Sequence, residues 1–288
     1  PEDRKCQRLE RKVKGKTTDP LLSILLVYYV LLIASKTDPN MEYEMNHKRR
    51  GLALIFNHET FQSCRERRGT NIDRNKLTKR FQDLGFEVNI HNDKTKKEVL
   101  REIRKAAEMD HADADCFVCI FLTHGTEGHI YASDGMFKIK EITDPFRGDQ
   151  CKSLVGKPKI FIFQACAGDK YEDAVTGMMG GCIDDEENVE ESANIYTIPA
   201  GADFLMCYSV AEGFYSFRDV NSGTFYIQDL CETLKDHGST LEFTELLTLV
   251  NQKVSQRSAN LGFGKLPKKQ MPCFTSMLTK KLYFRCNK

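Results

Sequence analysis

The stretch from Cys116 to Gly125 reads CFVCIFLTHG, an unbroken apolar run that leads directly into a threonine, a histidine and a glycine. Such a run is typical of a strand that is buried on both faces of a sheet. A second run, Ile160–Phe163, leads into Gln164-Ala165-Cys166. In parallel sheets, chemistry gathers just beyond the carboxyl ends of the strands. His124 and Cys166 are therefore predicted to follow two strands of one sheet, at the same edge.

Strand-like and helix-like patterns alternate on either side of these runs. Further strands are expected at Leu52–Phe56, Phe86–Ile90 and Phe204–Val210, with a terminal strand or hairpin at Cys273–Phe284. Apolar side chains recur at helical spacing in the intervening segments, at Leu77, Phe81 and Leu84; at Val99, Leu100, Ile103, Ala106 and Ala107; at Ile227, Leu230, Cys231 and Leu234; and at Phe243, Leu246, Leu247 and Val250. This alternation predicts an α/β fold with a mostly parallel sheet, covered by helices on both faces.

Capping signals mark two of these helices. Asp73 is predicted to cap the first helix, and Gly85 to end it. The pattern Thr95-x-x-Glu98 is typical of a capping box at the start of the next helix.

Composition indicates a globular protein of a reducing compartment. The 288 residues carry a net charge of +1, which does not favour a nucleic-acid partner. The eleven cysteines are scattered, and several lie inside apolar runs, so buried free thiols are expected rather than a disulfide framework. Cys116-x-x-Cys119 lies within a predicted strand, where residues three apart face opposite sides, and no second pair completes a metal site. We therefore expect a cytoplasmic protein without a bound metal.

The first forty-two residues differ in composition from the rest. Pro1–Lys16 is basic and lacks an apolar period, which indicates a solvated tail rather than a segment that binds nucleic acid or anionic lipid. Leu21–Ala34 is the most apolar segment, but it is shorter than the roughly 18–20 residues that span a bilayer. A buried or partner-facing segment is preferred over a membrane anchor, a signal-type segment or an atypical gene model, so membrane contact through Leu21–Ala34 is not expected.

The residues after the two apolar runs are those that a cysteine protease needs. Such an enzyme requires a thiol, an imidazole that takes and returns the thiol proton, and donors for the developing oxyanion. Cys166 and His124 would supply the first two, and the backbone N–H groups of Gly125 and Cys166 the third. Taken alone, the pattern leaves open a loop histidine and a small, unreactive cysteine.

Several motifs in order resemble one family. Gln164-Ala165-Cys166-x-Gly168 is similar to the pentapeptide around the caspase nucleophile, and His124 lies upstream as the caspase histidine does. The likeness continues through Met45–Phe61, Arg67–Asp73, Asp115–Gly128, Tyr208–Arg218 and Lys269–Phe284. It covers about Tyr43 to Phe284 and implies the caspase-like fold, with a twisted sheet of about six strands. It implies no metal or organic cofactor.

The resemblance also assigns roles residue by residue. Cys166 matches the nucleophile, His124 the general acid/base, and Gly125 with the Cys166 backbone the oxyanion hole. Arg67, Gln164 and Arg218 match the pocket for the substrate aspartate, and an arginine fork suits a carboxylate in a dry pocket. Ser216 to Arg218 would pair with the substrate backbone as an added strand, and Tyr215 and Phe217 would form the walls of the neighbouring pocket.

The sequence departs from the family pattern at three places. Ala167 follows the nucleophile where arginine or glutamine is usual, and Phe217 replaces the usual tryptophan, so a shallower groove is expected. Asp19 and Asp38 are each followed by proline, which disfavours cleavage after them. The processing sites expected in the linker, Asp184 and Asp185, are followed by further acidic residues.

The resemblance implies four parts: a prodomain-like segment at 1–42, a large-subunit part at 43–178, an acidic linker at 179–193 and a small-subunit part at 194–288. It predicts a zymogen of an effector-type, Asp-specific endopeptidase that acts in apoptosis. Its expected partners are proteins with an exposed aspartate, a second copy of the chain, an upstream activating caspase and inhibitor-of-apoptosis proteins.

Two other functions remain open at this point. Ala167 and the acidic linker would also suit a catalytically weak homologue that regulates an active caspase by dimerisation. A metacaspase-type peptidase with basic specificity is disfavoured, because Arg67 and Arg218 would repel a basic substrate side chain.

Overall fold

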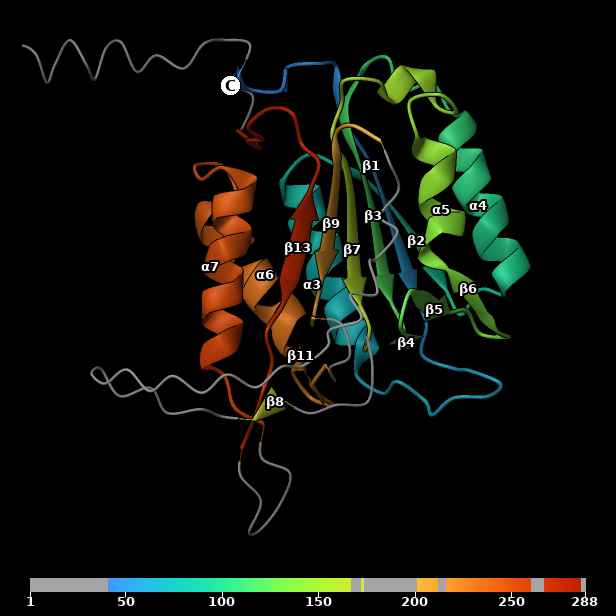
Figure 1. Cartoon of the computed structure of the whole chain (residues 1–288), viewed down its shortest axis with the longest axis vertical. Helices are drawn as coiled ribbons and strands as arrows, with labels where there is room; N and C mark the ends of the chain where they lie inside the picture. The colour runs from blue at the N-terminus through green and yellow to red at the C-terminus, as the bar shows by residue number, and fades with distance from the viewer. Residues whose placement is uncertain (1–40, 167–171, 174–200, 212–215, 260–266, 286–288) are drawn as a thin grey trace, which may run out of the picture. The chain divides into compact units, whose positions relative to one another are not determined.

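Six strands form the central sheet of this protein, in the order β13-β9-β7-β3-β1-β2 (Figure 1). The structure is a computed structural model, which describes residues 41–166, 172–173, 201–211, 216–259 and 267–285. The strands are β1 (Arg49–Asn57), β2 (Glu87–Asn92), β3 (Ala114–Leu122), β7 (Lys159–Gln164), β9 (Phe204–Tyr208) and β13 (Cys273–Ser276). All neighbours pair in parallel except β13, which is antiparallel to β9. The predicted mostly parallel sheet is confirmed.

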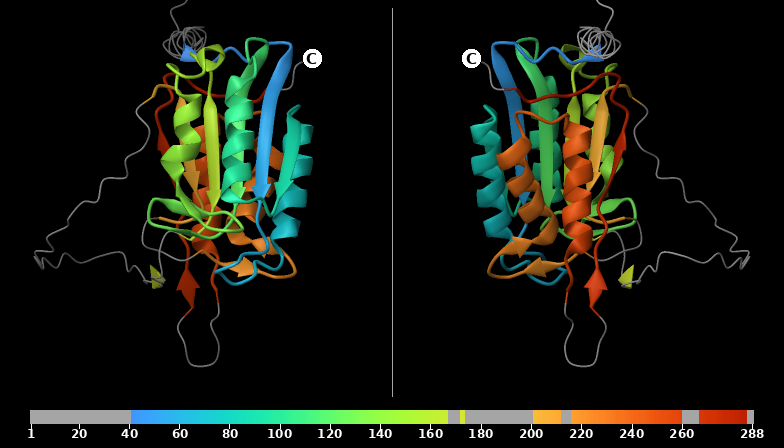
Figure 2. Two further views of the ribbon diagram at one scale, coloured as in Figure 1. Left: turned by 90° about the vertical axis from the view of Figure 1, so that its right-hand side faces the viewer. Right: turned by 90° about the vertical axis from the view of Figure 1, so that its left-hand side faces the viewer.

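Helices cover both faces of this sheet, as predicted (Figures 1 and 2). One face carries α3 (Thr70–Asp83), α6 (Phe225–His237) and α7 (Phe243–Gln256), and the other carries α4 (Lys96–Glu108) and α5 (Ile139–Thr143). Alternate residues of β3 enter the two cores, so Cys116 packs with the first group of helices and Cys119 with the second. This confirms that Cys116 and Cys119 do not form a pair.

Short elements, which the sequence did not predict, extend from the ends of the main ones. A three-stranded sheet consists of β4 (Gly125–Thr126), β5 (His129–Tyr131) and β6 (Met136–Lys138). Two hydrogen-bonded strand pairs are β10 (Arg218–Asp219) with β11 (Gly223–Thr224), and β8 (Glu172–Asp173) with β12 (Lys268–Lys269). The 3₁₀ turns η2 (Asp144–Phe146) and η3 (Lys152–Leu154) lie between β6 and β7.

Two local predictions need correction. Helix α3 begins at Thr70, with Gly69 at its N-cap and no side-chain cap, so Asp73 lies inside the first turn. Its carboxylate is buried and accepts the Thr224 N–H instead, because a tertiary partner satisfies it better than its own helix end. The predicted terminal strand is confined to β13, Cys273–Ser276. The capping box of Thr95 and Glu98 is confirmed.

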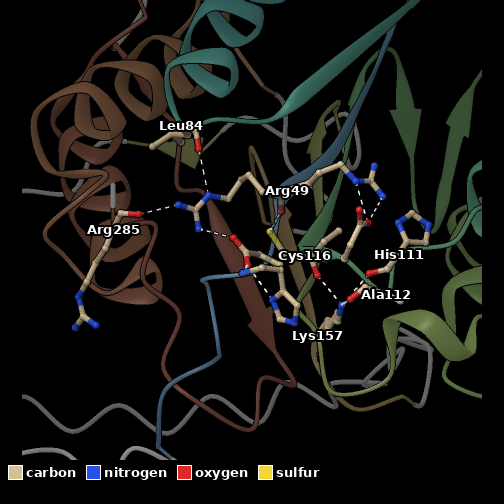
Figure 3. Close-up of polar contacts among 12 residues, drawn as sticks. Arg49, Leu84, His111, Ala112, Cys116, Lys157 and Arg285 are labelled. Carbon is tan, nitrogen blue, oxygen red and sulfur yellow. Dashed lines mark hydrogen bonds and ion pairs between the residues drawn. The ribbon is translucent and has the colours of Figure 1, made fainter. Parts of the chain in front are cut away.

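A cluster of charged groups holds the amino ends of β1 and β3 together (Figure 3). The Arg50 guanidinium lies 2.9 Å from the buried Asp115 carboxylate, and it donates to the Arg285 carbonyl at 2.7 Å. His47 contacts the same carboxylate at 2.9 Å. The Lys157 ammonium donates to three carbonyls of residues 111–114. These contacts stabilise the edge of the sheet opposite to the one from which His124 and Cys166 emerge.

Within the described part of the chain, no helix combines the length and the apolar character needed to cross a bilayer. The apolar segment Leu21–Ala34 lies outside the described residues, as do Ala167, Asp184, Asp185 and Tyr215.

Candidate active site

Strands β3 and β7 bring His124 and Cys166 to one edge of the sheet. The two strands are parallel neighbours, with Leu122 opposite Gln164. The Thr123 N–H continues the ladder and donates to the Gln164 carbonyl at 3.0 Å. The prediction that these strand ends lie together is therefore confirmed.

A cavity of about 240 Å³ lies at this edge. It is lined by Arg67, Thr123, His124, Gln164, Ala165, Cys166, Ser216, Phe217, Arg218 and Thr224. Every predicted substrate-binding or catalytic residue that the structure describes is in this set, except Gly125, which directly follows His124. Residues from distant parts of the sequence thus meet in one pocket that holds a thiol, an imidazole and two guanidinium groups.

The His124 ring is held from one side. Its Nε2 lies 2.7 Å from the Arg65 carbonyl, and the ring packs against Phe61 with 4.7 Å between the centroids. A carbonyl can only accept, so Nε2 carries the hydrogen and Nδ1 keeps a free lone pair when the ring is neutral. Burial lowers the pKa of His124, and the charges of Arg67 and Arg218 lower it further. The neutral base is favoured.

Gly125 lies directly against the nucleophile loop. A Cβ at this position would lie 2.6 Å from the Cys166 carbonyl oxygen and 2.9 Å from the Ala165 Cβ. No other residue type fits without displacing that loop. The Cys166 sulfur itself lies 4.0 Å from the Ser216 carbonyl oxygen.

Arg67 is oriented by groups beneath the pocket. Its side chain is only 2% exposed, and one Nη donates to the Thr70 hydroxyl at 2.7 Å and to the His58 carbonyl at 3.2 Å. The Thr70 hydroxyl donates in turn to the Asn57 side-chain oxygen at 2.8 Å. The guanidinium is therefore held in place before any ligand arrives, which reduces the entropy lost on binding.

A buried amide network forms the floor of the pocket. The Gln164 amide lies 2.7 Å from the Ser216 hydroxyl, and its Oε1 is buried without a partner among the described residues. Exchanging the amide oxygen and nitrogen lets Oε1 accept the Ser216 hydroxyl proton and places the Nε2 donor at the buried position that has no partner among the described residues. Gln270 donates to the Ser209 carbonyl at 2.7 Å and accepts the Phe217 N–H at 2.9 Å. Gln270 therefore ties the 216–217 segment to the end of β9.

Some residues of this site have no clear signal in the sequence. Gln270 stands in a basic segment with no strand pattern, and its contacts span more than fifty positions along the chain. Thr224 lines the cavity and could be recognised only as the N-cap of α6. The described cysteines are free thiols, as expected. In the described ranges, no group of metal-ligating side chains is found.

Comparisons with known proteins support one family. A family model described as the caspase domain matches residues 50–283. Caspase-6 of Gallus gallus is 55% identical over 256 residues, covering 86% of this chain and 84% of that protein. Caspase-6 of Mus musculus is 56% identical over 258 residues, covering 86% and 93%. The crystal structure of caspase-1 from Spodoptera frugiperda superposes with a TM-score of 0.77 at 39% identity, covering 87% of this chain and 98% of that one.

Proposed function

Because this chain belongs to the caspase family, and is an effector-type cysteine endopeptidase directed at aspartate, we propose that Cys166 is its nucleophile and His124 its general acid/base. The observation that carries the proposal is the single cavity lined by both residues together with Arg67 and Arg218. A nucleophile, a base and a cationic receptor for a carboxylate are the components that cleavage after aspartate requires.

The orientation of His124 sets the direction of proton transfer. Nε2–H donates to the Arg65 carbonyl, so Nδ1 is the atom that takes the Cys166 thiol proton. The thiolate then attacks the carbonyl carbon of the substrate aspartate, and the N–H groups of Gly125 and Cys166 stabilise the oxyanion. His124 returns the proton to the leaving amine, a thioester remains on Cys166, and water, deprotonated by the same imidazole, releases the acid product.

Specificity follows from the charges of the pocket. Arg67 is buried and Arg218 half-buried, so a substrate carboxylate between them would be desolvated and paired on two sides. The Gln164 amide would add a neutral donor. Ser216 to Arg218 would pair with the substrate backbone, and Tyr215 and Phe217 would form apolar walls. Phe217 is buried and lies 6.2 Å from Phe225, measured between ring centroids.

The enzyme acts on protein substrates and forms dimers, as its family does. We propose that two copies pair through β13, an edge strand of the sheet with one side unpaired among the described residues. Separation of the parts 43–178 and 194–288 by cleavage after Asp184 or Asp185 would mature a cytoplasmic zymogen. An upstream caspase would perform this cleavage, and inhibitor-of-apoptosis proteins would oppose the mature enzyme.

The proposal is tested by turnover of matched fluorogenic peptides that end in aspartate or in arginine. Purified protein should cleave the aspartate peptide, and Cys166→Ala should not. Cleavage of the arginine peptide would instead support the metacaspase-type specificity. A protein that is silent toward both peptides, yet pairs with an active caspase, would favour the regulatory function, for which Ala167 and the acidic linker are the supporting features.

A further inference from the structure

The two arginines of the cavity belong to separate elements. Arg67 lies in the loop that leads into α3, whereas Arg218 begins the β10–β11 hairpin, Arg218–Thr224. Thr224, at the other end of this hairpin, also lines the cavity. One substrate carboxylate can reach both guanidinium groups only if the hairpin is held at a fixed position relative to α3.

Helix α3 contacts the hairpin at successive turns. The buried Asp73 carboxylate accepts the Thr224 N–H, with oxygens at 3.0 and 3.2 Å from the nitrogen, across 151 positions of the chain. One turn further along, the Lys76 ammonium donates to the Ser222 carbonyl at 2.8 Å. At the helix start, a Cβ on Gly69 would lie 2.6 Å from the Val220 carbonyl oxygen. The hairpin is therefore docked along the first two turns of α3.

Gly223 makes the central contact possible. Its φ of +95° lies in the region that favours glycine, and a Cβ there would lie 2.2 Å from an Asp73 carboxylate oxygen. The carboxylate reaches the Thr224 amide through the space that the missing side chain leaves. The shape of the hairpin and the position of Asp73 are thus matched to each other.

We propose that Asp73 is a positioning residue for aspartate recognition, whose carboxylate holds the β10–β11 hairpin against α3 and so sets Arg218 relative to Arg67. The inference rests on the proposed roles of these two arginines. Asp73 is not among the residues that line the cavity, so it acts through the hairpin.

The surroundings of Asp73 make this contact dependent on pH. Burial raises the pKa of Asp73 to about 6, against the lowering effects of the Thr224 hydrogen bonds and of the charges of Arg67 and Lys76. Helix α6 contributes a titratable neighbour, the Cys231 thiol. Burial and the charge of Asp73 raise the pKa of this thiol to about 12, so it stays neutral. On the hairpin, the charged residues are Arg218 and Asp219, and the Asp219 carboxylate accepts amides of its own turn.

Protonation of Asp73 should weaken the contact between the hairpin and α3, because a neutral carboxyl oxygen accepts a weaker hydrogen bond than a carboxylate. Folding raises the pKa of this group, so its contribution to stability is present at low pH and is lost as the pH rises through about 6. The charged form is therefore kept at neutral pH at a cost in stability.

Asp73→Asn tests the inference, because asparagine keeps the shape and one acceptor but mimics the protonated state. Asp83→Asn is the matched control, since Asp83 lies on the same helix, is exposed and pairs with Arg80 of that helix. KM and kcat for an aspartate-ended peptide are measured from pH 5 to pH 8, together with the denaturant midpoint of unfolding. At pH 7.5, we expect KM of Asp73→Asn to exceed that of the parent roughly five- to tenfold, with a smaller change in kcat.

The ratio of the KM of Asp73→Asn to that of the parent should approach one at pH 5, where Asp73 of the parent is itself protonated. Titration of His124 affects both proteins alike and cancels in this ratio. The unfolding midpoint at pH 7.5 should be equal or higher in the variant. A ratio of one at every pH, or a rise in KM that follows a fall in the unfolding midpoint, would overturn the inference.

Lys76→Met provides a second test from an exposed position, should Asp73→Asn fold poorly. It removes the contact to Ser222 and should also raise KM. Because the Lys76 charge lowers the pKa of Asp73, its loss should also shift the pH dependence of KM to higher pH. An unchanged KM would contradict the proposed contact between α3 and the hairpin. Arg67→Ala and Arg218→Ala separate this inference from the proposed pocket. If both variants keep normal cleavage, the pocket assignment fails. If they lose cleavage while Asp73→Asn behaves as the parent, only the role of Asp73 fails.

Discussion

Arg67→Ala is the substitution that probes substrate recognition most sharply. With the side chain 2% exposed, a carboxylate bound beside it is desolvated, and its partner is lost in the variant. Removing one partner of a buried ion pair costs about 3–5 kcal/mol, which is roughly 10²- to 5 × 10³-fold in kcat/KM. For a matched peptide that ends in asparagine, the lost hydrogen bond has one charged partner instead of two, so a smaller decrease of roughly 10- to 150-fold is expected.

The assay compares kcat/KM for the aspartate and asparagine peptides in the parent and in Arg67→Ala. The variant also loses hydrogen bonds to Thr70 and His58, at about 1 kcal/mol each, so its unfolding free energy is measured in parallel. Arg68→Ala is the control, because that neighbouring side chain is 75% exposed and pairs with Glu66. Equal losses for the two peptides, or a similar loss in Arg68→Ala, would refute the assignment of Arg67 to the aspartate pocket.

Two further predictions concern maturation and pH. When the chain is incubated with an upstream caspase, mass spectrometry should find new termini after Asp185 or Asp184, together with a rise in activity. This cleavage should be faster than in the chain incubated alone. Activation without either cut would contradict the prediction. Because burial lowers the pKa of His124 and only the neutral ring accepts the thiol proton, kcat/KM should fall as the pH drops through a midpoint below the ordinary histidine value of about 6.5. A midpoint above that value would contradict the described environment of His124.

The sequence was sufficient to predict the mostly parallel sheet with its helices and the residues that follow the carboxyl ends of β3 and β7. The apolar runs of β3 and β7 are buried along their full length, and such runs have few alternatives to a central parallel strand. Once β3 and β7 were neighbours, the positions of His124 and Cys166 followed. Short strands such as β4 to β6 carry too few residues to show a period.

Residues that act through long-range contacts could not be predicted in the same way. Asp73 has the pattern of an N-cap, but its carboxylate is satisfied by an amide 151 positions away. Gln270 has no local pattern, and it matters because three partners from other segments surround it. Such pairings depend on how the elements pack, which hydrophobic periodicity does not encode.

The most direct test of the central claim is covalent labelling of the matured enzyme with a peptidyl aspartyl halomethyl ketone, followed by peptide mapping. The proposed mechanism predicts one labelled residue, Cys166, with inhibition in proportion to labelling. Excess aspartate-ended peptide should protect Cys166, and Cys166→Ala should take up no label. Labelling of Cys64 or Cys151 that accounts for the loss of activity, with Cys166 unmodified, would contradict the assignment of the nucleophile.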